Sequence, residues 1–305
     1  MKKNETVKRI LFITLSNIGD VVLTTPTLLT LIKRYNNAKI DVVGDARSRI
    51  LFNHCPLINN FYEKDKTKGL IGTIQLIRML RKNYYDIAVD LRSDGLLYFV
   101  RAGKKFHKVN NNNNIHSVEK HLQSIKEASI TNPAIWIGKE HENEARKILS
   151  KSNSKILAIG LGANSPQKIW PTKNYAELCN MLKDHFKLVV LVGDKKDDVF
   201  TKNFKTVFSG NVINLNGKVG LLTTAAILKR AELFIGNDSG LGHIASAVKT
   251  KTFTIFGPGE PHRYKPWGEA SGWFQDDERN ISKIKPDVIF ENVMKNMESV
   301  GNKSK

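Results

Sequence analysis

Phe234-Ile-Gly-Asn-Asp-Ser-Gly-Leu-Gly-His-Ile-Ala-Ser-Ala247 is the stretch from which the fold can be predicted. Its first part continues an apolar run over residues 232–235, which is typical of a buried strand. Asp238 and Ser239 follow with side chains that can cap a helix, and apolar residues then recur at helical spacing. The stretch therefore predicts a strand, a tight turn and the start of a helix.

The predicted turn has the features of a phosphate site. Gly236, Gly240 and Gly242 allow a ligand to approach the backbone closely, and free amides at a helix N-terminus favour an anion. Asp238 could accept hydrogen bonds from sugar hydroxyls, and His243 would point back toward the same turn. A capped helix with a core histidine is the alternative, and this stretch alone does not decide between the two.

Strands alternate with helices along the whole chain. Buried strands are predicted over residues 8–15, 40–43, 86–91, 155–161, 187–192, 232–235 and 252–256. Such alternation is typical of parallel, doubly wound α/β sheets. The pattern restarts after residues 152–154, so we predict an N-terminal domain over residues 1–152 and a C-terminal domain over residues 153–305.

Some segments give no clear pattern. Residues 92–108 are basic, residues 110–114 are a run of asparagines that predicts a flexible loop, and residues 257–273 predict a mixed loop.

The chain carries a net charge of +19 over 305 residues. This charge suggests an anionic partner, namely nucleic acid, an acidic membrane surface or a phosphorylated substrate, and a solvated basic surface is the alternative. Cys55 and Cys179 lie far apart without metal-ligand spacing, which predicts free thiols in a reducing compartment. Because no apolar run approaches the roughly 20 residues that span a bilayer, we expect a cytoplasmic protein that at most rests on a membrane surface.

Three polar loops follow predicted strands, at residues 16–20, 162–168 and 236–243. Ligands of open parallel sheets bind outside the carboxyl ends of the strands, so we expect the first loop to confront the other two across a cleft. Lys168 could then neutralise phosphate oxygens. Asp20 could take a proton from an incoming hydroxyl, although an aspartate at a helix start can also be a cap.

Motifs of several other classes are absent from the sequence. It contains no P-loop, no Gly-x-Gly-x-x-Gly after the first strand, no His-Glu-x-x-His and no carboxylate cluster with metal-ligand spacing. A P-loop nucleotidase, a dinucleotide oxidoreductase and a metal-dependent hydrolase are therefore disfavoured, and we predict no metal site.

In these loops the sequence resembles glycosyltransferase family 9, which includes the bacterial lipopolysaccharide heptosyltransferases. The resemblance is carried by Ile18-Gly-Asp-Val-Val-Leu-Thr-Thr-Pro26, Tyr85-Asp-Ile-Ala-Val-Asp-Leu91, Lys168-Ile-Trp-Pro171, Gly236-Asn-Asp-Ser-Gly-Leu-Gly-His243, and Phe256-Gly-Pro258 with Pro266-Trp-Gly268. It implies a GT-B fold, in which two Rossmann-like domains face each other across the active site.

The resemblance also implies an activity: inverting, metal-independent transfer of heptose, commonly from ADP-heptose, to an inner-core lipopolysaccharide sugar. The nucleotide sugar is a co-substrate, and no cofactor is expected. We expect a monomer in peripheral contact with the inner face of the cytoplasmic membrane, without a nucleic-acid partner.

Roles for individual residues follow from the resemblance. It implies that Asp20 is the general base and that Lys168 holds the donor phosphates. The predicted donor-binding residues are Asn164, Ser165, Lys168, Asp197, Val219, Asp238, Ser239, Gly240, Leu241 and His243. The predicted acceptor-binding residues, for which solvated positions are the alternative, are Ser16, Asn17, Gly19, Arg47, Arg49, Arg92 and Lys120.

Two departures from the family pattern leave the donor open. Asp197 stands where relatives often carry a glutamate directed to the ribose, and Ala163-Asn-Ser165 replaces a loop richer in hydroxyls. The alternatives are the same machinery with another nucleotide sugar or acceptor, a non-catalytic sugar-nucleotide binder, and a nucleic-acid binder. The last is suggested by charge alone, because aromatic and basic residues are not interleaved.

Overall fold

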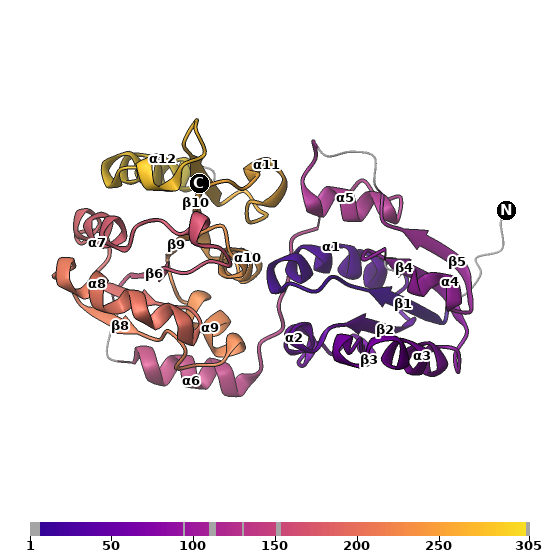
Figure 1. The fold of residues 1–305 in the computed structure, drawn as a ribbon. Helices are drawn as coiled ribbons and strands as arrows, with labels where there is room; N and C mark the ends of the chain where they lie inside the picture. Colours follow the sequence, from indigo (N-terminus) through magenta and orange to yellow (C-terminus); the bar gives the residue numbers. More distant parts are fainter. Residues whose placement is uncertain (1–6, 94, 110–113, 130, 151–153, 303–305) are drawn as a thin grey trace. The chain divides into compact units, whose positions relative to one another are not determined.

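The computed structural model describes residues 7–93, 95–109, 114–129, 131–150 and 154–302. The chain divides into two compact units, Met1–Trp136 and Ile137–Lys305, and each is an α/β fold (Figure 1). Residues 110–113 of the predicted asparagine loop, and residues 152 and 153 of the predicted linker, lie outside the described residues.

Unit 1 contains a parallel sheet of five strands, called sheet A here. In chain order the strands are β1 (Arg9–Ile13), β2 (Lys39–Gly44), β3 (Ile58–Glu63), β4 (Tyr85–Asp90) and β5 (Ala102–His107). They lie in the order β3-β2-β1-β4-β5. The order therefore reverses between β1 and β4, the kind of switch point at which open α/β sheets bind ligands.

Helices cover both faces of sheet A. On one face, α3 (Gly69–Leu80) and α4 (Leu96–Phe99) form a core with Leu11 and Ile13 of β1. Successive side chains of a strand point to opposite faces, so Ile10 and Phe12 face the other layer. There α1 (Ile18–Arg34) packs against α5 (Ser117–Ser124) (Figure 1). The short α2 (Ala46–Arg49), η1 (Ile50–Phe52) and η2 (Lys66–Lys68) complete the unit.

A buried histidine joins α5 to α1. His121 is 3% exposed, and its Nδ1 lies 3.2 Å from the carbonyl oxygen of Leu23. Because a carbonyl only accepts, Nδ1 carries the proton of a neutral ring. Burial lowers the pKa of His121 to about 4, and the nearby Lys108, His116 and Lys120 act in the same direction.

Lowering the pH from 6.5 toward 4 should destabilise unit 1 through His121. The unfolded chain protonates His121 near pH 6.5, and the folded chain does so only near pH 4. The folded state therefore keeps its full stability above pH 6.5 and loses stability as the pH falls from 6.5 to 4. The loss should reach about 3 kcal/mol. Urea unfolding at several pH values should show a smaller loss for His121→Gln than for the wild type, and equal losses would contradict this assignment.

Unit 2 contains a parallel sheet of six strands, called sheet B here. In chain order the strands are β6 (Ile156–Gly160), β7 (Leu188–Leu191), β8 (Val212–Asn214), β9 (Leu233–Asn237), β10 (Lys251–Phe256) and β11 (Ser271–Gln275). They lie in the order β11-β10-β9-β6-β7-β8. The order reverses between β6 and β9, so the loops after these two strands flank the switch point.

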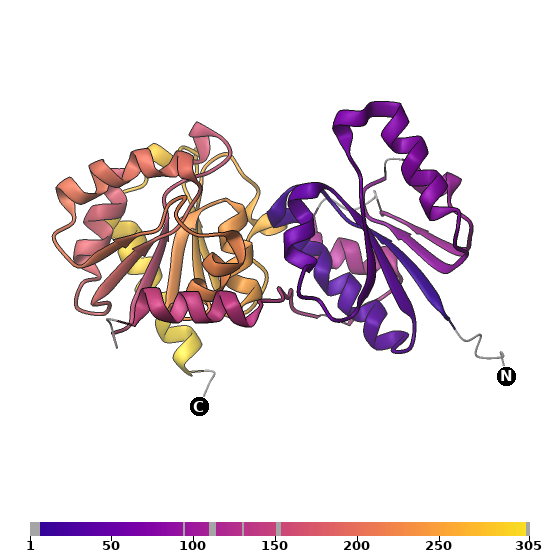
Figure 2. The same ribbon diagram turned by 90° about the horizontal axis from the view of Figure 1, so that it is seen from below.

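Sheet B also lies between two helical layers. On one face, α7 (Thr172–Met181), α8 (Val199–Val207) and α12 (Pro286–Asn302) enclose a core that contains Trp170 and Tyr175. The other face carries α6 (Lys139–Leu149), α9 (Leu221–Leu228) and α10 (Gly240–Ala247) (Figures 1 and 2). The remaining short elements are α11 (Pro261–Tyr264), η3 (Pro166–Lys168), η4 (Lys195–Asp198) and η5 (Ile281–Lys283). In the described parts of both units, no helix is long and apolar enough to cross a membrane.

The division between the units falls earlier than the predicted boundary after residue 152. Helix α6 packs against α9 and so belongs to unit 2. Glu144 Oε2 accepts a hydrogen bond from Thr223 Oγ1 at 2.6 Å, and Glu142 forms an ion pair with Lys229 at 2.8 Å. The charged sequence of α6 therefore reflects polar contacts with its own unit as well as exposure to solvent.

Candidate active site

Three segments meet at the carboxyl edge of sheet B around Asn237, the fully buried last residue of β9. Its Nδ2 donates to the carbonyl oxygens of Leu161 and Gly162, at 2.9 and 3.4 Å. Its Oδ1 accepts from the backbone N–H of Trp170 and from the hydroxyl of Tyr175, both at 2.9 Å. Asn237 thereby fixes both ends of the loop that carries Lys168.

Lys168 lies in η3 and pairs with Asp238. Its Nζ donates to Asp238 Oδ2 at 2.5 Å, and the side chains are 33% and 11% exposed. An ammonium carries three protons, so this pair leaves Lys168 able to bind phosphate oxygens as well. The prediction that side chains cap α10 is wrong. Asp238 pairs with Lys168 instead, and the N-cap residue Ser239 makes no side-chain cap hydrogen bond.

The start of α10 presents hydrogen-bond donors next to this ion pair. Ser239 Oγ is buried and has no hydrogen-bond partner among the residues that the structure describes. The backbone N–H groups of Gly240 and Leu241 belong to the first turn, where a helix has no internal acceptors for them. His243 follows on the same helix and is 7% exposed. A hydroxyl, two amides and an ammonium form a suitable environment for a diphosphate.

Asp197 is buried against the loops that follow β6 and β7. It is 6% exposed, and its Oδ2 accepts a hydrogen bond from the N–H of Asp194 at 2.9 Å. A Cβ at Gly162 would lie 2.1 Å from Asp197 Oδ1, and one at Gly193 would lie 2.6 Å from Oδ2, so a side chain at either place would displace the Asp197 carboxylate. Burial raises the pKa of Asp197 above its ordinary value. Its predicted contact with a ribose stays a prediction.

The other predicted donor residues lie in loops at the same edge. Asn164 is exposed and Ser165 half-buried in the loop after β6. Val219 is half-buried in the loop after β8, which is held by a hydrogen bond from the N–H of Gly217 to the carbonyl of Gly193 at 2.9 Å. Unit 2 thus places all predicted donor-binding residues along one edge of its sheet.

In unit 1, Asp20 is half-buried in the first turn of α1. Asn17, the N-cap residue, donates from Nδ2 to Asp20 Oδ2 at 2.9 Å. Asp20 is therefore not the N-cap residue of α1, and Asn17 orients its carboxylate. Gly19 is buried beside it, and Ser16 Oγ accepts from Lys66 Nζ at 3.4 Å.

A network of charges lies at the carboxyl ends of β2 and β4. Arg92 Nη1 is 2.7 Å from Asp45 Oδ1, with both side chains 10% exposed, and Lys66 Nζ is 3.1 Å from Asp45 Oδ2. Burial would raise the pKa of Asp45, but the hydrogen bonds and charges of Arg92 and Lys66 lower it below its ordinary value. Arg92, predicted to contact the acceptor, is thus held by a buried carboxylate.

The other basic residues predicted to bind the acceptor have different surroundings. Arg49 lies 3.5 Å from Glu63 and stacks over the ring of Phe61. Lys120 is 8% exposed, which differs from the accessible position that an acceptor contact requires. Arg47 is exposed and makes no ion pair within the described part of the chain. Asp20 and Lys168 belong to different units, and their approach across a cleft stays a prediction.

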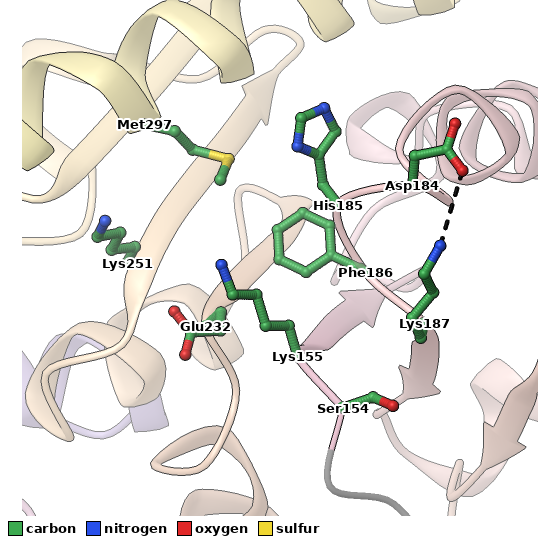
Figure 3. A pocket seen from close by; sticks show the side chains of 9 residues that line it. All are labelled: Ser154, Lys155, Asp184, His185, Phe186, Lys187, Glu232, Lys251 and Met297. Atoms are coloured by element: carbon green, nitrogen blue, oxygen red, sulfur yellow. Dashed lines mark ion pairs between the residues drawn. The ribbon is translucent and has the colours of Figure 1, made fainter.

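A hollow of about 360 Å³ lies at the opposite, amino edge of sheet B (Figure 3). Lys155, Glu232 and Lys251 line it from the starts of strands, and Asp184 and Lys187 form an ion pair at 3.7 Å beside them. Because ligands of parallel sheets bind at the carboxyl edge, this hollow is separate from the candidate site.

The chain matches known proteins in both sequence and fold. Residues 95–293 match the family model of glycosyltransferase family 9 (heptosyltransferase). Lipopolysaccharide heptosyltransferase 3 of Escherichia coli (strain K12) is 26% identical over 285 residues, which cover 82% of this chain and 83% of that protein.

Solved structures show the same fold. The glycosyl transferase family 9 protein from Veillonella parvula DSM 2008 superposes with a TM-score of 0.85 at 20% identity, over 96% of this chain and 97% of that chain. E. coli ADP-heptose lps heptosyltransferase II superposes with a TM-score of 0.80 at 21% identity, over 96% and 99%. The fold is of the GT-B type, and the chain belongs to glycosyltransferase family 9, the heptosyltransferase family.

Proposed function

We propose that this glycosyltransferase moves heptose from ADP-heptose to a sugar of the inner core of lipopolysaccharide. The observation that carries the proposal is the Lys168–Asp238 pair beside the start of α10. The Lys168 ammonium and the backbone N–H groups of the helix can together bind a diphosphate. Membership of the family supports heptose as the sugar. The similarity to E. coli ADP-heptose lps heptosyltransferase II supports ADP-heptose as the donor.

The proposed step is a single displacement. Asp20 takes the proton of an acceptor hydroxyl, and the hydroxyl oxygen forms a bond to the anomeric carbon from the face opposite ADP. The bond from that carbon to the terminal phosphate oxygen breaks, and its electron pair leaves with ADP. Because the hydroxyl attacks from the face opposite the leaving ADP, the anomeric configuration inverts.

Negative charge grows on the leaving diphosphate during this step. Lys168 and the N–H groups at the start of α10 would stabilise that charge, because preorganised donors act most strongly where charge develops. In this proposal no metal ion or cofactor takes part. Transfer should therefore continue at an unchanged rate when a chelator of divalent ions is present.

The charge of the chain supports the proposed acceptor and location. A net charge of +19 suits an acceptor that carries phosphates and carboxylates on an anionic membrane. We place the protein as a monomer at the inner face of the cytoplasmic membrane. The basic groups of unit 1, with Arg47 exposed and Lys66 next to Ser16, could meet the acceptor anions.

Transfer to lipopolysaccharide that lacks its outer heptoses tests the proposed function. With ADP-heptose present, the product should gain one heptose by mass spectrometry while an equal amount of ADP is released. ADP-heptose should also raise the melting temperature, because only the folded protein binds it. If UDP- or GDP-sugars stabilise the protein and ADP-heptose neither stabilises it nor is consumed, the heptose assignment is wrong.

A further inference from the structure

Large apolar side chains lie exposed at the N-terminal half of α3. Leu70, Ile71 and Ile74 are 82%, 68% and 48% exposed, whereas Leu76 and Leu80 on the opposite side of the helix are 1% and 0% exposed. A group of exposed apolar side chains of this kind marks an interaction site more often than chance. We call Leu70, Ile71 and Ile74 the α3 patch.

Basic residues flank the α3 patch along the chain. Residues 66–85 contain five lysines and arginines and neither aspartate nor glutamate. Lys66 and Lys68 precede the helix and pair with Asp45 and Asp65, whereas the exposed Arg78, Arg81 and Lys82 follow the patch. The surface thus combines aliphatic side chains with a local excess of positive charge, which is the composition of helices that lie in the interface of an anionic bilayer.

Exposed aromatic side chains lie on α4 and just after the C-terminal end of α3. Tyr98 and Phe99 of α4 are 76% and 55% exposed, and Tyr84, just after α3, is 56% exposed. Helices α3 and α4 share one core, and Arg81 Nη1 donates to the carbonyl oxygen of Phe99 at 3.5 Å. Figure 2 shows α3 (purple) as an outer layer of unit 1. Exposed tyrosine and phenylalanine rings beside a basic helix suit the headgroup region of a membrane.

The position of the α3 patch relates it to Asp20. Helix α3 follows β3, so its N-terminus lies at the carboxyl edge of sheet A, the edge that carries the loop before α1. Lys66 connects the two places, since its Nζ lies 3.1 Å from Asp45 Oδ2 and 3.4 Å from Ser16 Oγ. A lipid surface at the α3 patch would therefore bring the sugar end of a membrane-anchored glycolipid toward Asp20.

We propose that the α3 patch docks unit 1 onto an anionic phospholipid bilayer. The aliphatic side chains enter the acyl boundary, and the flanking lysines and arginines contact lipid phosphates. The charge of the surface favours anionic lipid over an apolar protein groove, because a groove that accepts three aliphatic side chains needs no flanking positive charge. The benefit to catalysis rests on the proposed function, but docking itself does not.

Sedimentation with lipid vesicles tests this proposal without donor or acceptor. The wild type should bind vesicles of phosphatidylethanolamine with phosphatidylglycerol and should not bind pure phosphatidylcholine vesicles. The triple variant Leu70→Ser, Ile71→Ser, Ile74→Ser should lower the partition coefficient by about tenfold or more. A variant with Arg78→Gln, Arg81→Gln and Lys82→Gln should lower it by on the order of fivefold for each charge removed.

A matched control is provided by Val199→Ser, because Val199 is 70% exposed on α8 of unit 2. This variant should bind vesicles as the wild type does. The proposal is overturned by any of three results. The wild type does not bind anionic vesicles, the serine triple variant binds them as well as the wild type, or Val199→Ser lowers binding as much as the triple variant does. Since the assay contains no sugar substrate, a failure to transfer heptose leaves its result intact.

Discussion

Asp20→Asn should lower kcat by about 100- to 10,000-fold, the usual contribution of a positioned general base. Asparagine has nearly the same shape as aspartate, and its carbonyl oxygen can still accept the hydrogen bond that Asn17 donates at 2.9 Å. The variant should therefore keep the local structure and lose only the ability to take a proton. Rates of ADP release from ADP-heptose with the lipopolysaccharide acceptor measure the effect.

Two comparisons separate this role from a structural one. ADP should raise the melting temperature of Asp20→Asn as much as that of the wild type, because the predicted donor-binding residues lie in unit 2. Asn17→Ala removes the hydrogen bond that orients the carboxylate and keeps the carboxylate itself, so its loss of kcat should be smaller than that of Asp20→Asn. Full activity of Asp20→Asn would refute the proposed base.

The central strands and the donor loops were predictable because each carries a strong local signal. β1, β6 and β9 are buried on both faces and read as continuous apolar runs. The segments that gave no signal are at the sheet edges. β5 contains Lys104 and Lys105 on its exposed surface, and β11 is a short strand with Gly272 as its second residue. β5 is a strand because it pairs with β4, and β11 is a strand because it pairs with β10. The residues of β5 and β11 alone do not predict this pairing.

The candidate site shows the same limit at the level of single residues. Asp238 has a residue type and a position that predict a helix cap, and the cation supplied by Lys168, 70 residues away, overrides that preference. Asn237 is a site residue that the prediction does not include. Its amide follows an apolar strand directly, and that position is a usable signal because a buried polar group needs hydrogen-bond partners. Its four hydrogen bonds could be identified only once the loops were placed.

Lys168→Ala should lower kcat by about 100-fold or more, because in the proposed mechanism it removes the cation that stabilises the leaving diphosphate. The measurement is the rate at saturating ADP-heptose, so that weaker donor binding is separated from slower transfer. Lys168→Arg keeps the charge and should retain more activity than Lys168→Ala. The loss in Lys168→Arg should still be measurable, since a guanidinium differs from an ammonium in shape and hydration.

Lys168→Ala also leaves Asp238 without its ion-pair partner, which can lower stability as well as rate. Asp238 is 11% exposed, and without Lys168 its carboxylate would lose a charge-assisted hydrogen bond, which destabilises the folded unit by about 1–3 kcal/mol. The double variant Lys168→Ala, Asp238→Asn removes the uncompensated charge and should regain most of the melting temperature. It should not regain the rate, because no cation returns to the diphosphate. If the double variant recovers both, Lys168 acts only by neutralising Asp238, and another group must stabilise the leaving ADP.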